Sequence, residues 1–420
     1  MKNLFPLLSL LFFSCESPTE PEGCDGVPGS GLVFDECGEC GGNNGSMDEC
    51  GICDGNNESM DECGVCDGNT IEECGSCDFI FLWDECFNIE ETTELIFGGV
   101  FCTFAPDIVI SYDNVDMLCV GEGENTIIDL ANLISNGDDY STVTNLWIKN
   151  NDGTITKNSV SRPVEIDDMP AVTDIGLFGE ERFYRPMGGR IRRLLPVETH
   201  RGCPYTCSFC NSPGQNRLYG DGDFLKGMSF FRKKSMDLVK KEIENHIKEW
   251  KVEYIYFWAD TFLAWSDDEF EQFYKMYSDI KLPFWCQTRI ETIDEEKFRK
   301  LQDVGLNRIT FGLEHGNEDF RRDVVKREYS NEDAIKKMKI VEKIGVPYSV
   351  NNIIGFPGET RELAFDTIKL NRHFKSDNTN CSILVPFHGT ELHSLSVEKG
   401  YLDYNTICTV STQADSLLTF

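Results

Sequence analysis

The chain has 420 residues, of which 40% are hydrophobic, so it can build two or three domains with a sizeable buried core. Its formal net charge of -33 is concentrated near the N-terminus, because no Lys or Arg occurs between Lys2 and Lys149. Such an acidic segment repels polyanions, which excludes nucleic acid as its partner. The remaining residues carry nearly balanced charge, as an ordinary enzyme does.

The first predicted element is an export signal over residues 1–15. Lys2 precedes an apolar run from Leu4 to Phe13, which is too short to span a bilayer and has the length of a signal-peptide core. Ser14 followed by Cys15 resembles the lipobox of bacterial lipoproteins, which implies export and a lipidated, membrane-anchored Cys15. The alternative is a plain signal peptide with an incidental cysteine.

A linker over residues 16–34 leads into an acidic, cysteine-rich repeat over residues 35–90. Each unit reads Asp/Glu-Cys-Gly-x-Cys, and the copies begin at Asp35, Asp48, Asp61 and Glu72. A regular repeat with few large apolar residues predicts a linear array that is held by cross-links instead of a core. Disulfides, zinc on paired cysteines, or calcium on the Asp-Gly-Asn turns would each supply that order. We favour disulfide-linked spacer units, which resemble the stalk repeats of bacterial surface proteins.

From residue 95 to residue 150 the pattern changes to alternating strands and helices. One strand ends at Gly98 and Gly99, and a second ends at the turn Gly121–Glu124, ahead of an amphipathic helix. This βα-βα pattern is typical of a doubly wound sheet. It resembles the C-terminal half of the cobalamin-binding domain in cobalamin-dependent radical S-adenosylmethionine (SAM) enzymes. The resemblance implies that cobalamin's nucleotide tail would contact Gly98, Gly99, Gly121, Glu122 and Gly123.

The first half of that domain is missing from the pattern. No Asp-x-His-x-x-Gly cobalt-ligand motif is present, and the first histidine of the chain is His200. We therefore expect a truncated domain that binds cobalamin weakly or not at all. The alternative is a structural role, in which the segment only packs on the following domain, beyond a connector over residues 151–190.

Three cysteines beyond residue 190 share one short loop. Cys203, Cys207 and Cys210 follow an apolar strand with Cys-x3-Cys-x2-Cys spacing. Three thiolates in one loop can hold three irons of a 4Fe–4S cubane and leave the fourth iron open to another ligand. A zinc site with His200 as its fourth ligand is the alternative. In the radical SAM family the open iron chelates SAM, and the resemblance implies that Phe209 lies beside the adenine.

Strands and helices alternate through the rest of the chain. We predict strands at residues 254–258, 284–288, 308–312, 348–354 and 382–386, and helices at residues 235–250, 267–277, 294–304, 331–344 and 361–374. With the strand before Cys203 they make six βα-like units, so residues 191–420 should form a partial (β/α)6 barrel, an α/β fold. Active sites of such barrels lie at the carboxyl ends of the strands, where the distinctive polar motifs fall.

The order and spacing of these motifs resemble the cobalamin-dependent radical SAM family over roughly residues 95–405. The resemblance implies SAM contacts for Asp260, Arg289 and Glu314, and a turn near SAM at Gly355. A rim ion pair is the alternative for Asp260 and Arg289. The implied activity is reductive cleavage of SAM to a 5′-deoxyadenosyl radical, for methyl transfer or oxidative rearrangement of a small-molecule or lipid-like substrate. Such enzymes need a low-potential electron donor such as flavodoxin or ferredoxin.

The two parts of the chain imply different compartments. The signal and lipobox imply membrane-anchored export, whereas an oxygen-sensitive cluster needs the reducing cytoplasm. The localisation is therefore open between the two. The conflict also raises two alternatives to an enzyme, namely an exported lipoprotein with a non-catalytic barrel and a fused or misassembled reading frame.

Overall fold

The computed structural model describes the backbone of residues 79–82 and 85–88, and the chain over residues 95–171, 175, 179–220 and 229–407. The chain divides into two compact units between Thr93 and Glu94. In the first unit, β1 (Phe79–Leu82) pairs antiparallel with β2 (Glu85–Asn88). The predicted signal, lipobox and repeat units before residue 79 lie outside the described residues.

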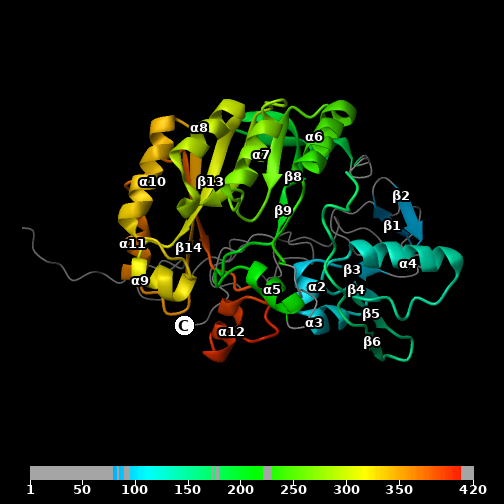
Figure 1. Cartoon of the computed structure of the whole chain (residues 1–420). Helices are drawn as coiled ribbons and strands as arrows, with labels where there is room; N and C mark the ends of the chain where they lie inside the picture. Colours follow the sequence, from blue (N-terminus) through cyan, green and yellow to red (C-terminus); the bar gives the residue numbers. More distant parts are fainter. Residues whose placement is uncertain are drawn as a thin grey trace, which may run out of the picture. The chain divides into compact units, whose positions relative to one another are not determined.

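The second unit is built on a curled, seven-stranded sheet (Figure 1). Its order is β15-β14-β13-β12-β11-β8-β7, and neighbours are parallel except β7 with β8. The strands are β7 (Tyr184–Met187), β8 (Arg190–Glu198), β11 (Tyr254–Trp258), β12 (Phe284–Arg289), β13 (Leu306–Glu314), β14 (Tyr348–Ile354) and β15 (Asn378–Ile383). The parallel strands follow chain order from β8 to β15, which confirms the predicted partial barrel.

Helices cover the outer face of this sheet (Figure 1). They are α6 (Met236–Trp250), α7 (Asp267–Tyr277), α8 (Glu295–Val304), α10 (Asn331–Ile344) and α11 (Arg361–Asn371). Side-chain caps explain where they begin: Ser235 Oγ accepts the Leu238 N–H at α6, and Ser266 forms a capping box with Glu269 at α7. The bounds of α7, α10, β11 and β14 match the predicted ranges residue for residue.

The last strand of the sheet lies earlier in the chain than predicted. β15 covers Asn378–Ile383, whereas the expected range was 382–386. Residues 378–382 are exposed and polar, because β15 is an edge strand with little to pack against. The prediction followed the apolar residues 383–385, which begin only where the strand ends.

Aromatic side chains fix α7 against the centre of the sheet. Phe257 of β11 packs against Phe273 and Tyr277 of α7 and Phe284 of β12, with ring centroids 5.2–5.4 Å apart. All four rings are buried. Burial of several large rings in one cluster contributes strongly to stability and holds the ends of β11 and β12 in place.

A separate four-stranded sheet forms the segment before the barrel. Its strands are β3 (Ile96–Phe97), β4 (Met117–Cys119), β5 (Leu146–Lys149) and β6 (Ile155–Lys157), and its helices are α2 (Val100–Phe104), α3 (Pro106–Ile110) and α4 (Glu124–Asn136). Only β3 and β4 pair in parallel. The sheet is therefore mixed, not doubly wound, and β6 extends it past residue 150. β3 is an edge strand, and its Phe97 and the nearby Phe101 of α2 are exposed.

Short elements complete the second unit. They are the helical turns Glu180–Phe183, Ile290–Thr292 and Arg321–Val325, the strands β9 (His200–Arg201) and β10 (Arg232–Lys233), and the helices α5 (Ser212–Gly220), α9 (Glu318–Phe320) and α12 (Glu391–Glu398). Helices α5, α9 and α12 gather at the lower side of Figure 1. No helix among the described residues is long and apolar enough to cross a membrane.

Burial of His246 on α6 generates a prediction about acid stability. Its side chain is 2% exposed, and burial lowers its pKa from 6.5 to about 4, with Lys234 acting in the same direction. Between these pH values the unfolded chain binds a proton here that the folded chain does not. The stability contributed by neutral His246 is thus present above pH 6.5 and lost as the pH falls toward 4.

We expect the His246→Gln variant to show a weaker pH dependence of the free energy of unfolding, measured in urea between pH 6.5 and 4. The difference in slope should reach up to about 1.4 kcal/mol per pH unit. The His373→Gln variant, which changes an exposed histidine, serves as the control and should keep the wild-type slope. Identical slopes for wild type and His246→Gln would contradict the assignment.

Candidate functional site

The three-cysteine loop follows β9 and carries its sulfurs inward. Cys203 and Cys207 are buried, and Cys210 is half-buried. Cys203 Sγ lies 3.5 Å from Thr261 Oγ1, and Cys210 Sγ accepts the Ser212 N–H at 3.5 Å. Hydrogen bonds of this kind orient thiolate ligands of iron–sulfur clusters and tune the reduction potential. Sequence reasoning missed Thr261, although it directly follows the predicted Asp260.

Arg289 at the end of β12 also contacts this loop. Its Nη1 donates to Cys207 Sγ at 2.9 Å, while Nε and Nη2 donate to Glu291. The ring of Tyr205 lies 3.9 Å from its guanidinium carbon. Arg289 is thus held beside a cysteine sulfur, and its contact with SAM stays a prediction.

The loop leaves β9 through Gly202. This residue has a φ of +82°, and a Cβ there would lie 2.8 Å from the carbonyl oxygen and the ring of Phe230. Only glycine combines that conformation with so close an approach. The backbone path into Cys203 is therefore fixed by Phe230.

The donor set of the loop fits a multi-iron cluster. Burial raises the pKa of Cys203, and that of Cys210 to about 12, so without metal both are neutral thiols, and metal binding must displace their protons. No group of three or more His, Cys, Asp or Glu side chains in the described part of the chain is placed to hold a single metal ion. His200, the fourth ligand of the zinc alternative, packs its ring against Phe231 and Trp265. In a cubane, each of three thiolates binds a different iron, so they need no common metal position.

A cavity of about 1420 Å³ opens beside the loop, at the carboxyl ends of β8 and β11. On the barrel side it is lined by Phe209, Cys210 and Asp260. On the side of the preceding segment it is lined by Gly99 and by residues 121–124. The structure therefore places two sets of predicted contacts around one cavity. One set was predicted to contact SAM and the other to contact cobalamin. Gly98, Arg289 and Gly355 do not line it.

Glu314 faces a second cavity, of about 740 Å³, between β13, β14 and β15. Phe209 lines both cavities. Glu314 has a φ of +66°, and the register between β13 and β14 shifts between Gly312 and Glu314. A residue with a side chain is strained in this left-handed region, and such strain is found at binding sites.

The Glu314 carboxylate is held by a buried arginine. Arg327 lies 3.1 Å from Glu314 Oε1 and donates to the Gly312 carbonyl oxygen at 2.7 Å. Burial raises the pKa of Glu314, although Arg327 opposes the shift. Sequence reasoning missed Arg327, because it follows a single π-helical turn and belongs to no motif.

The turn at Gly355 is tied to the end of β13. The Gly355 N–H donates to Glu359 Oε2, and Glu359 Oε1 lies 3.0 Å from His315 Nε2. His315 Nδ1 accepts the Asn317 N–H, so Nε2 is the donor to Glu359. This buried pair fixes the loops after β13 and β14 relative to each other.

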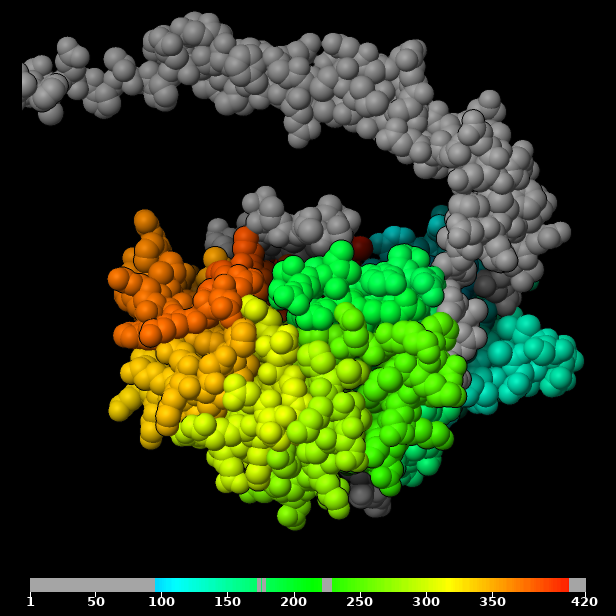
Figure 2. Space-filling view, turned by 90° about the horizontal axis from the view of Figure 1, so that it is seen from above, coloured from blue at the N-terminus to red at the C-terminus, as the bar shows by residue number. Residues whose placement is uncertain are grey.

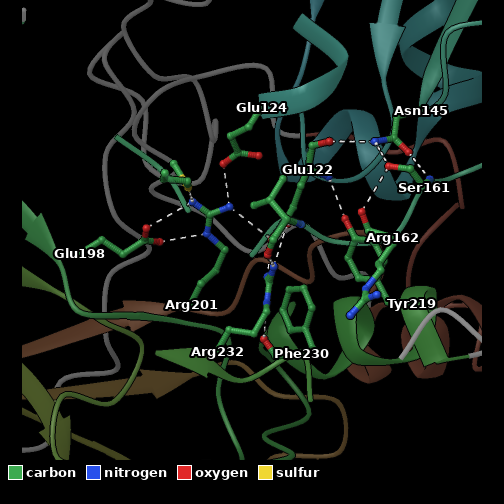
Figure 3. Close-up of polar contacts among 12 residues, drawn as sticks. Glu122, Glu124, Asn145, Ser161, Arg162, Glu198, Arg201, Tyr219, Phe230 and Arg232 are labelled. Carbon is green, nitrogen blue, oxygen red and sulfur yellow. Dashed lines mark hydrogen bonds and ion pairs between the residues drawn. The ribbon is translucent and has the colours of Figure 1, made fainter. Parts of the chain in front are cut away.

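The Glu122 carboxylate points toward Arg232 of β10 and is held there by several hydrogen bonds (Figure 3). It accepts hydrogen bonds from Nη1 and Nη2 of Arg232, the first at 3.0 Å, and from the Val164 N–H at 2.9 Å. Burial alone would raise the pKa of Glu122, but Arg232 holds it below its ordinary value. The space beside the adjacent Gly121 is also filled, since a Cβ at this residue would lie 2.7 Å from Tyr219 Oη.

The loop after β15 lies against α5, and the green and the orange-to-red residues meet in Figure 2. Asn211 Nδ2 donates to the His388 carbonyl oxygen at 2.7 Å, and Arg217 donates to that of Gly389 at 3.3 Å. The ring of Phe104 from α2 occupies the space that a Cβ at Gly389 would need. The segment, α5 and the C-terminal loop therefore pack together at the edge of the cavity.

Comparisons with known proteins show what the barrel resembles. The profile of the Radical SAM superfamily matches residues 197–370. An uncharacterised methyltransferase of Pyrococcus horikoshii is 25% identical over 322 residues, which are 75% of this chain and 65% of that protein. The anaerobic magnesium-protoporphyrin IX monomethyl ester cyclase of Rubrivivax gelatinosus is 25% identical over 307 residues, 71% of this chain and 52% of the cyclase. The chain thus spans about half to two thirds of the length of these relatives.

Solved structures of radical SAM enzymes resemble this chain in fold. The radical SAM methyltransferase TsrM of Kitasatospora setae, solved with cobalamin and a [4Fe-4S] cluster, matches with a TM-score of 0.55 and 17% identity, over 73% of this chain and 60% of TsrM. The cobalamin-dependent SAM radical enzyme OxsB matches with a TM-score of 0.51 and 17% identity, over 66% of this chain and 38% of OxsB. The chain shares their half-barrel fold.

The contacts that Tyr219 and Arg232 make with residues 121–122 predict that the chain binds cobalamin weakly. Tyr219 Oη lies where a Cβ at Gly121 would stand, and Arg232 engages the Glu122 carboxylate. We expect no stoichiometric cobalamin to remain after anaerobic incubation with hydroxocobalamin and gel filtration, as measured by absorbance. A cobalamin-dependent methyltransferase treated identically serves as the positive control. One tightly held equivalent per chain would show that the turn rearranges to admit the cofactor.

Proposed function

Because residues 197–370 form a radical SAM domain, we propose that this chain is an enzyme that cleaves SAM reductively and applies the resulting 5′-deoxyadenosyl radical to a small organic substrate. The observation that carries the proposal is the cavity in which Cys210 and Phe209 of the cysteine loop meet Asp260. A 4Fe–4S cluster on Cys203, Cys207 and Cys210 supplies the electron for this cleavage when bound.

We assign the contacts with SAM to residues from different strand ends. Asp260 is the acceptor for the amino group, since it lines the cavity with Cys210. Phe209 packs on the adenine, because it lines both cavities and so lies between the two ends of the ligand. Glu314, kept in place by Arg327, accepts hydrogen bonds from the ribose hydroxyls. Arg289 reaches the carboxylate from beside Cys207.

The relatives favour two reaction types for this chain, methyl transfer and oxidative ring formation. The cyclase acts on a porphyrin ester, and the TsrM structure with tryptophan substrate and a SAM analogue is an example of a methyltransferase with a small substrate. The cavity of about 1420 Å³ has room for SAM and such a substrate together. A low-potential donor of the flavodoxin or ferredoxin class would deliver the electron.

Anaerobic reconstitution of the full chain with iron and sulfide tests the proposal. We expect one 4Fe–4S cluster per chain, with an electron paramagnetic resonance (EPR) spectrum that changes on addition of SAM. The Cys203→Ala variant should form no cluster, because it removes a thiolate ligand. The Cys286→Ala variant is the matched control, since Cys286 is buried within β12 among the hydrophobic side chains of the barrel core. Tightly bound zinc without iron uptake would refute the cluster, and a cluster without SAM cleavage would favour a non-catalytic barrel.

We further propose that the enzyme is active only in a reducing compartment. Iron binds the three cysteines as thiolates, whereas the cysteine repeat gains order by oxidation or metal uptake. Fractionation of expressing cells should therefore find iron and SAM cleavage in the cytosolic fraction, at levels that rise on deletion of residues 1–90. Cluster-loaded, SAM-cleaving protein in the exported membrane fraction would overturn this localisation.

A further inference from the structure

We propose that Glu122 is a positioning residue for the cysteine loop, through two arginines that face each other next to Cys203. The inference rests on the proposed function, because it assigns Glu122 to the cluster of the SAM-cleaving site. It gives the segment before the barrel a role that needs no cobalamin. Glu122 connects that segment to the strand before the loop through its contacts with Arg201 and Arg232 (Figure 3).

The two arginines are direct neighbours across a very short ladder. β9 and β10 pair antiparallel over two residues each, and Arg201 lies opposite Arg232. Like charges that are directly opposite in a ladder repel each other, and so short a ladder has few hydrogen bonds to resist them. Arg201 is separated from Cys203 only by Gly202. Opening of this ladder would therefore move the first cluster ligand.

Glu122 contacts both arginines and neutralises their repulsion. It forms two hydrogen bonds with Arg232, and its Oε1 lies 3.3 Å from Arg201 Nη1. The side chains of Arg232 and Glu122 are only 6% and 11% exposed. Water can therefore screen these charges little, which makes the carboxylate difficult to replace.

Further carboxylates complete the surroundings of Arg201. Glu124 accepts from Arg201 at 2.7 Å, and Glu198 at the end of β8 accepts from it at 3.0 and 3.2 Å. Lys234 lies 3.9 Å from Glu198 and 3.0 Å from Glu242 on α6. Charges of alternating sign thus run from the segment, past the cysteine loop, to α6.

The backbone of Glu122 is equally fixed. Its N–H donates to Tyr219 Oη at 2.8 Å, and its carbonyl oxygen accepts from Asn145 at 2.8 Å. Tyr219 stacks on Phe230 with centroids 5.3 Å apart, and Phe230 is the ring that packs on Gly202. The Tyr219–Phe230 stack therefore links Glu122 to the cysteine loop in addition to the ion pairs with Arg201 and Arg232.

The test compares cluster retention in the reconstituted full chain. Glu122→Gln keeps the shape of the side chain and removes its charge. Loss of a direct partner of a metal ligand costs about 10–100-fold in affinity. Glu122 contacts no cluster ligand and acts through Arg201, two residues before Cys203, so its effect should be smaller. We expect roughly threefold to tenfold faster iron release to a chelator than in wild type, together with a changed EPR spectrum of the reduced cluster. The control, Asp107→Asn, breaks an exposed ion pair with Lys157 in the same segment and should behave as wild type.

A double variant separates positioning from simple packing. In Glu122→Gln/Arg232→Gln the repulsion between the two arginines is gone, so iron release should be slower than in Glu122→Gln alone. Release from Glu122→Gln at the wild-type rate with an unchanged spectrum would overturn the inference, as would faster release from the double variant. Should Glu122→Gln not fold, Glu124→Gln at the rim tests the same route, and wild-type release from it would count against the inference. A wild-type chain without iron uptake would instead refute the proposed function itself.

Discussion

The repulsion between Arg201 and Arg232, placed directly opposite each other just ahead of Cys203, is the constraint around which the site is organised. Buried charges of this kind are tolerated only with partners, and removing one partner of a buried pair costs about 3–5 kcal/mol. The carboxylates come from the preceding segment and from the end of β8, and with the packing of Phe230 on Gly202 they position the start of the cysteine loop. The segment and the barrel therefore form one functional unit.

The rest of the site follows the logic of a parallel barrel. Each strand from β8 to β14 ends at a residue or turn that contacts the loop, a cavity or a neighbouring turn. The aromatic cluster around Phe257 fixes the strands, and buried pairs such as His315–Glu359 fix the loops after them. Phe209 lies where the two cavities meet, so one ring separates the cluster side of the site from the Glu314 side.

Much of this could be predicted from the sequence, for physical reasons. Helix α7 and strand β14 have strong periodicity and clear boundaries, so their ranges were predicted correctly. Strand β15 was misplaced because an exposed edge strand carries no hydrophobic pattern. The partners of Glu122 are separated from it by 79 and 110 residues in the chain, and no local pattern records such contacts. The glycines at residues 121 and 123 predicted a ligand-binding turn, and no local pattern could show that Gly121 also makes room for Tyr219.

The stack of Tyr219 on Phe230 links two glycines that lie far apart in the sequence. Gly121 makes room for the hydroxyl of the first ring, and Gly202 makes room for the edge of the second. These four positions cannot drift independently during evolution, because a larger residue at either end pushes on the same pair of rings. We therefore expect a homologue that changes one of them to change its neighbour in the stack as well, so that the segment and the cysteine loop vary together.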